Sequence, residues 1–125
     1  MSAERRPNKE LGDFGERIAG HRLEAAGMRI RGRKVRTVGG EIDILAEDGD
    51  DFVFVEVRTR RGERGLAAES LTPTKLRRMW QCAVDYCDSN SIDPSRIRID
   101  AVTVEIDRRG SVAGVTHFRG LEIPD

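Results

Sequence analysis

The sequence predicts an α/β protein in which helices flank a mixed central β-sheet, with the element order α-β-β-β-α-β-β. Two segments carry apolar residues at helical spacing, and five shorter segments show the alternating or continuously apolar pattern of strands. Clusters of glycine, aspartate, asparagine and serine separate these segments and indicate turns. Because a helix lies between the third and fourth strands, a crossover is expected there, and these two strands are predicted to run parallel.

The two predicted helices have recognisable ends. The first opens at Pro7 and ends at Gly27, since glycine is a natural C-terminal stop. The second has Thr72 as N-cap and Pro73 at the first helical position, and it ends near residues 88–90. The apolar stripe of this second helix consists of Leu76, Met79, Trp80, Ala83, Val84 and Cys87. We expect this stripe, including the only tryptophan, to face the core.

The five predicted strands differ in their expected places in the sheet. They span residues 28–38, 41–46, 52–59, 97–106 and 112–118. The first has the pattern of an edge strand, and the second and third are expected to form a hairpin around Asp48-Gly49-Asp50. Residues 61–70 are rich in glycine and charge and are predicted to be a mobile loop.

Length and composition bound the class of protein. The 125 residues fit a single domain, 1–125, with an ordered core of about 9–119. No apolar stretch is long enough to span a membrane, and the first ten residues lack the apolar centre of a secretory signal, so we expect a cytoplasmic protein without membrane contact. Cys82 and Cys87 are expected to be buried thiols, because their spacing suits neither a disulfide nor a zinc site.

Charge is segregated along the chain although the formal net charge is zero. Residues 29–36 and 58–64 are basic, whereas residues 41–56 contain acids and no lysine or arginine. Basic segments of this kind bind nucleic acid in some proteins and are simply solvated faces in others. Charge alone does not decide between these two interpretations.

Two carboxylates interrupt strand-like apolar runs. Residues 52–55 are apolar on both faces, as expected of a central strand, and Glu56 breaks that pattern. Side chains alternate along a strand, so Glu56 shares a face with Arg58, and Asp43 shares a face with Glu41 on the neighbouring strand. If pairing brings the two strands together, their carboxylates can hold Mg²⁺ or Mn²⁺ through oxygen ligands.

A structural interpretation of these acids remains open at this point. Glu56 can form an ion pair with Arg58 or Arg60, and Asp43 can pair with the basic strand. Glu16 on the first helix can be a third acid of the site if the helix packs across the strand ends, or an exposed acid that pairs with a nearby arginine. Spacing does not choose between these alternatives.

Several short motifs, in this order, give the sequence a resemblance to a known family. They are Gly15-Glu16, Gly40-Glu41-Ile42-Asp43, the run from Val53 to Arg60, Leu71-Thr72-Pro73-Thr74-Lys75, and Arg98-Ile99-Asp100-Ala101-Val102. Together they resemble the small bacterial YraN family over about residues 9–119. That family looks like a member of the restriction-endonuclease-like, PD-(D/E)xK superfamily, and it is similar in outline to archaeal Holliday-junction resolvases.

The resemblance implies roles for four residues. Asp43 and Glu56 would bind a divalent metal, Glu16 would assist them, and Arg58 would occupy the place of the superfamily's lysine. Arg58 keeps the positive charge, but an arginine does not lose its proton in proteins and cannot act as a general base. Lys75 is either an ammonium that reaches the site from the second helix or a surface lysine.

The resulting hypothesis is a metal-dependent nuclease that acts on DNA with Mg²⁺ or Mn²⁺. The cations expected to contact the nucleic-acid backbone are Arg31, Arg33, Lys34, Arg60, Arg61, Lys75, Arg77 and Arg78. The alternative is a non-catalytic nucleic-acid-binding protein with the same fold, motivated by Arg58, and a third possibility is an interaction protein that binds no nucleic acid. A homodimer is compatible with the resemblance to junction resolvases, and the edge strand at residues 28–38 is available either for dimerisation or for DNA contact.

Overall fold

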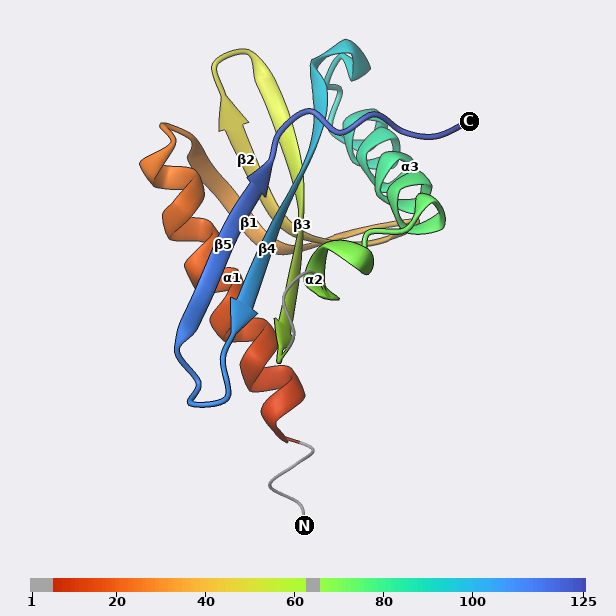
Figure 1. The fold of residues 1–125 in the computed structure, drawn as a ribbon. Coiled ribbons are helices and arrows are strands. Elements are labelled where there is room, and N and C mark those ends of the chain that lie inside the picture. Colours follow the sequence, from red (N-terminus) through yellow and green to blue (C-terminus); the bar gives the residue numbers. More distant parts are fainter. Residues whose placement is uncertain (1–5, 63–65) are drawn as a thin grey trace.

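A five-stranded mixed sheet lies between helices in the computed structural model, which describes residues 6–62 and 66–125 (Figure 1). The elements are α1 (Arg6–Ala25), β1 (Arg29–Thr37), β2 (Gly40–Asp48), β3 (Asp51–Arg61), α2 (Leu66–Glu69), α3 (Pro73–Ser89), a 3-10 turn (Pro94–Arg96), β4 (Ile97–Ile106) and β5 (Val112–Phe118). The predicted class and the order of the long elements are confirmed. The segment predicted as a loop contains the end of β3 and the short helix α2, and its residues 63–65 lie outside the described part of the chain.

The strand order in the sheet is β1-β2-β3-β4-β5, which leaves β1 at an edge, as predicted. β3 and β4 run parallel, and every other neighbouring pair is antiparallel. The crossover between the parallel strands passes through α3. This connection matters for function because it brings the first turn of α3 beside the middle of β3, where Lys75 contacts Glu56.

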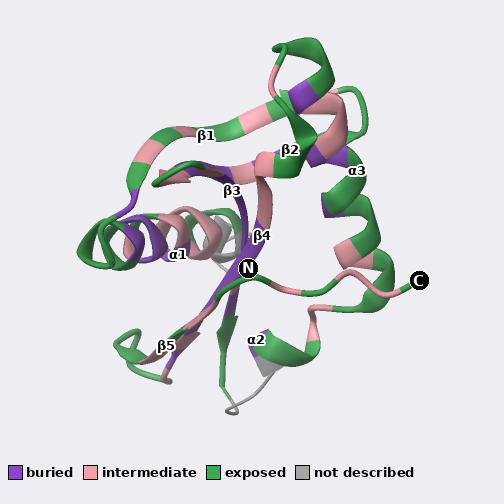
Figure 2. Ribbon diagram, turned by 90° about the horizontal axis from the view of Figure 1, so that it is seen from above, coloured by how far each residue is buried: buried purple, intermediate pink, exposed green. Residues whose placement is uncertain are grey.

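The two faces of the sheet are covered by different helices. On one face, Ala19 and Leu23 of α1 pack with residues such as Val53 and Val55. On the other, Met79, Cys82, Ala83 and Cys87 of α3 pack with residues that include Leu45, Phe52, Phe54 and Ile99. β3 is buried from both sides through most of its length (Figure 2), which explains its continuous apolar run.

Trp80 does not join this core. Its side chain is 39% exposed, so the prediction of a buried tryptophan is wrong. The buried residues of α3 follow helical spacing from Met79, and Trp80 lies about 100° further around the helix, outside that stripe. Both cysteines are buried free thiols, as predicted.

A glycine allows α1 to approach β3 closely. A Cβ atom built on Gly15 would overlap Oγ1 of Thr59, so no larger residue fits without movement of the helix or the strand. Gly12, one turn earlier, has nothing within 4 Å of its Cβ position. The close contact at Gly15 brings the next residue, Glu16, to the end of the sheet where β3 finishes.

A buried ionic network joins β4 to β5 and to the β2–β3 turn. Asp100 is fully buried and accepts hydrogen bonds from Arg98 Nε at 3.0 Å, Arg98 Nη2 at 3.1 Å and the Gly120 backbone N–H at 3.0 Å. His117 Nε2 lies 2.8 Å from Asp100 Oδ2, the oxygen that Arg98 Nη2 also contacts, and Arg98 Nη1 donates to Asp48 at 2.8 Å. The last sequence motif is therefore structural, and His117 is a partly buried partner that reaches Asp100 from β5.

The chain continues in ordered contact beyond residue 119. The Leu121 backbone N–H donates to the Ile99 carbonyl at 2.8 Å, and Leu121 and Ile123 pack against the core beneath α3. No helix within residues 6–62 and 66–125 has the length and apolar character needed to cross a membrane.

Candidate active site

The site begins where β2 and β3 cease to pair. Their antiparallel register runs from Asp48 opposite Asp51 to Ile44 opposite Val55, and the next two residues in that register are Asp43 and Glu56. At this point the Val57 backbone N–H donates to Asp43 Oδ2 at 2.9 Å. A side-chain carboxylate thus replaces the backbone acceptor that a continued ladder would supply, and the two acids are brought side by side as the sequence predicted.

Glu56 is buried and forms ion pairs with two cations. Only 5% of the residue is exposed. Its Oε2 atom lies 3.1 Å from Arg58 Nε and 3.4 Å from Lys75 Nζ. The Arg58 Nε is itself buried and makes no hydrogen bond, so its contact with Glu56 is electrostatic without donor alignment.

Burial and the neighbouring carboxylate dominate the protonation of Glu56. Loss of solvent, followed by the charge of Asp43, raises the pKa of Glu56 to about 7, although Lys75 and Arg58 both act in the opposite direction. The two cations therefore leave the negative charge of the pair only partly compensated. A further cation, such as a metal ion, would stabilise the ionised form of both carboxylates.

Glu16 approaches this pair from α1, but it has a partner of its own. Burial and the charge of Asp43 raise its pKa, while a hydrogen bond from Lys34 opposes the shift. Lys34 Nζ lies 3.2 Å from Glu16 and 3.1 Å from Asp13. Glu16 is thus a half-buried acid near the site, paired with β1 rather than with an arginine.

The backbone places Lys34 for this role. In the register of β1 and β2, Lys34 falls between the pairs Arg33–Ile44 and Val35–Ile42, and so stands opposite Asp43. Its φ of 50° is in the left-handed region, which is uncommon for a residue other than glycine. A cation proposed from sequence as a DNA contact is instead engaged with two acids of α1.

The acids do not form a three-ligand cluster. Across the residues that the structure describes, no group of three or more histidine, cysteine, aspartate or glutamate side chains is arranged to hold a metal ion. Asp43 and Glu56 remain as a pair of oxygen donors. Such a pair suits Mg²⁺, which commonly takes one or two carboxylates and completes its coordination with water and substrate phosphate.

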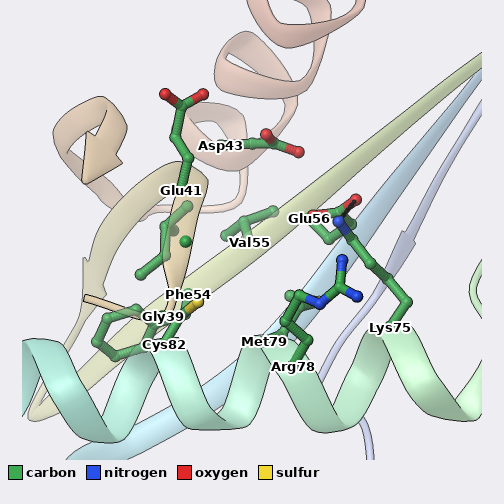
Figure 3. A pocket seen from close by; sticks show the side chains of 12 residues that line it. Gly39, Glu41, Asp43, Phe54, Val55, Glu56, Lys75, Arg78, Met79 and Cys82 are labelled. Carbon is green, nitrogen blue, oxygen red and sulfur yellow. Dashed lines mark ion pairs between the residues drawn. The ribbon is translucent and has the colours of Figure 1, made fainter. Parts of the chain in front are cut away.

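Two cavities meet at the carboxylate pair, and Asp43, Glu56 and Lys75 line both of them. The α3 cavity, of about 420 Å³, lies between α3 and the start of β2 (Figure 3). Its remaining lining residues are Gly39, Gly40, Glu41, Ile42, Phe54, Val55, Arg78, Met79 and Cys82. The α1 cavity, of about 680 Å³, lies between α1 and the end of β3. Its remaining lining residues are Leu11, Gly12, Glu16, Val57, Arg58, Thr59, Arg60 and Arg61.

The sequence did not decide whether Lys75 reaches the site or lies on the surface. Its side chain is 27% exposed and lies against Glu56, as Figure 3 shows, and it lines both cavities. Thr72 caps α3 by accepting a hydrogen bond from the Lys75 backbone N–H at 3.2 Å, which fixes the first turn of the helix. The capping motif was recognisable in the sequence, but the contact with β3 depends on the crossover geometry.

The other proposed cations divide into two groups. Arg60 and Arg61 line the α1 cavity, and Arg78 lines the α3 cavity. Arg31 instead donates to Glu47 at 2.6 Å, toward the opposite end of β2 from Asp43. The Arg33 guanidinium lies against Gly20 of α1, and Arg77 is exposed on α3.

Fold and site together define a small α/β protein with a carboxylate pair, flanked by cations, at the opened end of a mixed sheet. Residues 15–104 match the family described as "Uncharacterised protein family UPF0102", and the chain belongs to this family. UPF0102 is the YraN family, so this match confirms the family expected from the sequence motifs.

Relatives in this family span nearly the whole chain. A UPF0102 protein of Kineococcus radiotolerans is 40% identical over 118 residues, which cover 93% of this chain and 96% of the relative. One from Mycolicibacterium vanbaalenii is 41% identical and covers 90% of this chain and 93% of the relative. One from Dichelobacter nodosus is 43% identical and covers 83% of each.

A solved structure with a similar trace is Pyrococcus furiosus SfsA in complex with Ca²⁺. It is 17% identical, with a TM-score of 0.43, and the match covers 93% of this chain and 65% of that longer chain. Similarity at this level does not establish a shared activity.

Proposed function

We propose that the protein is a metal-dependent nuclease that hydrolyses phosphodiester bonds in DNA. The observation that carries the proposal is the placement of Asp43 and Glu56 opposite each other where β2 and β3 stop pairing, between two cavities. The resemblance to restriction-endonuclease-like proteins supports the same assignment of these two acids. The cations that line the α1 cavity supply charge suited to the phosphate backbone.

The residues present fit Mg²⁺ or Mn²⁺. Their donor atoms are carboxylate oxygens, and the raised pKa of Glu56 indicates negative charge that the two neighbouring cations do not fully compensate. When bound, the metal would polarise a phosphate oxygen and lower the pKa of a water molecule. Asp43 would use the oxygen that is not committed to the Val57 N–H, while that hydrogen bond fixes the orientation of its carboxylate.

Lys75 and Arg58 have different capacities in this mechanism. Both contact Glu56 Oε2 and would orient that carboxylate and stabilise charge on a phosphate. An arginine side chain does not act as a general base, so Arg58 serves only as a cation. Lys75 is a compact ammonium that reaches the carboxylate from α3, and Glu16, which accepts a hydrogen bond from Lys34, adds a further carboxylate near Asp43.

Calorimetric titration with Mn²⁺ tests the proposal without any choice of substrate. We expect binding to the wild type and its loss in Asp43→Ala and in Glu56→Ala, with folding checked by circular dichroism. Glu41→Ala is the matched control, because Glu41 lines the same α3 cavity but points away from the pair in Figure 3. Absence of binding to the wild type, together with loss of stability in both variants, would show that the acids are only structural partners of the cations.

The alternative function is nucleic-acid binding without hydrolysis. The observation that favours it is Arg58 at the position of the superfamily's lysine, in contact with an already buried Glu56. Arg58→Lys separates the two functions. Cleavage of DNA gained by this variant indicates a weakened enzyme, whereas retention of DNA without cleavage by both proteins indicates a binding protein.

A further inference from the structure

The two cavities that meet at the carboxylate pair differ in charge. The α1 cavity contains Arg58, Arg60 and Arg61 beside the shared Lys75, and it suits a chain of phosphates. The α3 cavity contains Glu41 in addition to the shared acids, and its inner wall is apolar. Its one further cation, Arg78, is directed toward Glu56 rather than toward Glu41 in Figure 3.

The lining of the α3 cavity disfavours a phosphate and favours a neutral group. Ile42, Phe54, Val55, Met79 and Cys82 form the apolar part of its wall. The carboxylates of Glu41, Asp43 and Glu56 outnumber the cations Lys75 and Arg78, so the lining offers no excess of positive charge to an anion. A neutral group with apolar faces and hydrogen-bonding edges matches this combination. The volume of about 420 Å³ lies within the range of about 300 to 1,000 Å³ that is usual for pockets that bury small ligands.

We propose that the α3 cavity receives an unpaired nucleobase, so that the substrates of this protein carry an unpaired nucleotide next to the bond to be cleaved. This inference rests on the proposed function and names its substrate class. In a nucleotide the base and the phosphate project from different sides of the sugar. A strand crossing the carboxylate pair can therefore place phosphates in the α1 cavity and one base in the α3 cavity.

The proposal requires the base to be free of its partner strand. A paired base is stacked and hydrogen-bonded inside the duplex, and placing it in a protein pocket requires unpairing and unstacking. A bulged or single-stranded nucleotide has already lost much of that stabilisation. The α3 cavity therefore discriminates in favour of unpaired positions without reading the identity of the base.

Fluorescence anisotropy in EDTA tests this inference, because no metal is present and nothing is cleaved. The probes are a labelled DNA duplex with one bulged adenine and the same duplex fully paired. We expect the bulged duplex to bind at least about fivefold more tightly, given the usual contribution of stacking one base on a protein. Equal affinity for the two duplexes would overturn the inference.

Cys82→Leu narrows the α3 cavity and should bring the ratio of the two affinities close to one. Cys87→Leu is the matched control, since Cys87 is also a buried thiol of α3 but does not line the cavity, and its ratio should stay at the wild-type value. Circular dichroism verifies that both variants fold. A bulge preference that survives in folded Cys82→Leu contradicts the assignment of this cavity.

A measurement on the wild type alone covers the case in which the variants do not fold. With 2-aminopurine at the bulge, acrylamide quenching should fall on binding, and unchanged quenching would overturn the proposal. The outcomes also separate the inference from the proposed function. Mn²⁺ binding without bulge preference removes only the inference, bulge preference without Mn²⁺ binding removes only the nuclease, and failure to bind either duplex at low salt removes both.

Discussion

Both cations beside Glu56, Arg58 and Lys75, contact the same oxygen atom of its carboxylate, Oε2. The sequence predicted an acid that interrupts a buried strand and a cation two residues later. It also allowed an ion pair between them, and the structure contains that pair. The ion pair does not conflict with the metal hypothesis. The pKa of Glu56 stays raised although both cations lower it, so the negative charge of the carboxylate pair can still be stabilised by a metal ion.

This raised pKa predicts an unusual pH dependence of stability. The folded state holds a proton on Glu56 up to about pH 7, whereas the unfolded state releases it near the ordinary value of 4.5. Between those pH values the folded state binds more protons, so the contribution of Glu56 to stability falls as the pH rises. Glu56→Gln should therefore raise the free energy of unfolding at pH 8 by on the order of 2 kcal/mol, with a much smaller gain near pH 4.

Urea denaturation in chelator-containing buffer at both pH values measures this effect. Glu41→Gln is the control, and this exposed position should change the free energy of unfolding by less than about 0.5 kcal/mol at either pH. Parallel pH profiles of wild type and Glu56→Gln would show that the folded state does not hold the proton.

Among the elements, α1 depends on a glycine for its position. Gly15→Ala should destabilise the protein by about 1 to 3 kcal/mol, because the added methyl group overlaps Thr59 and either the helix or β3 must shift. Gly12→Ala, on the same helix with open space around it, should instead stabilise by about 0.5 to 1 kcal/mol through helix propensity. Thermal and urea unfolding of the two variants give the comparison, and effects of equal sign would contradict the close contact.

The link between β4 and β5 depends on Asp100. Burial works against its ionised form, but hydrogen bonds from Arg98, the Gly120 N–H and His117 outweigh that effect and hold the pKa of Asp100 below its usual value. Its contribution to stability is therefore present at neutral pH and is lost as the pH falls through the folded-state pKa.

Asp100→Asn should cost about 3 kcal/mol at neutral pH, because it leaves Arg98 partly buried with one fewer carboxylate. Asp50→Asn, at an exposed position in the β2–β3 turn, is the control and should have little effect on urea denaturation. A similar loss in both variants would mean that the network contributes no specific stability.

The sequence predicted the long elements because their hydrophobic periods are clear, and it predicted the carboxylate pair because charged residues stand out in apolar strands. It missed contacts between elements that are distant in the chain. Lys75 meets Glu56 only through the crossover, and Lys34 meets Glu16 only because α1 packs beside β1. Hydrophobic periodicity and charge pattern describe one helix or strand at a time, so they do not indicate which residues of distant elements come into contact.

At the scale of the whole molecule, the formal net charge is zero, but cations outnumber acids among the residues that line the α1 cavity. DNA binding should weaken with salt, and Arg60→Ala combined with Arg61→Ala should reduce the slope of log affinity against log salt by about 2. Arg29→Ala combined with Arg31→Ala is the matched control, since both arginines already pair with Glu47. Anisotropy titrations at several salt concentrations give the slopes, and an equal reduction in both double variants would place the DNA elsewhere.

The hydrogen bond from the Val57 N–H to Asp43 gives the molecule an internal reporter. The resonance of this amide depends on the charge of the carboxylate that accepts its proton, so occupation of the site by any cation should displace one identifiable peak in a nitrogen–proton correlation spectrum. Neighbouring amides in the ordinary β3 ladder would supply the reference. The hydrogen bond at the end of the β2–β3 pairing thus makes the state of the site visible by NMR of ¹⁵N-enriched protein, without a substrate.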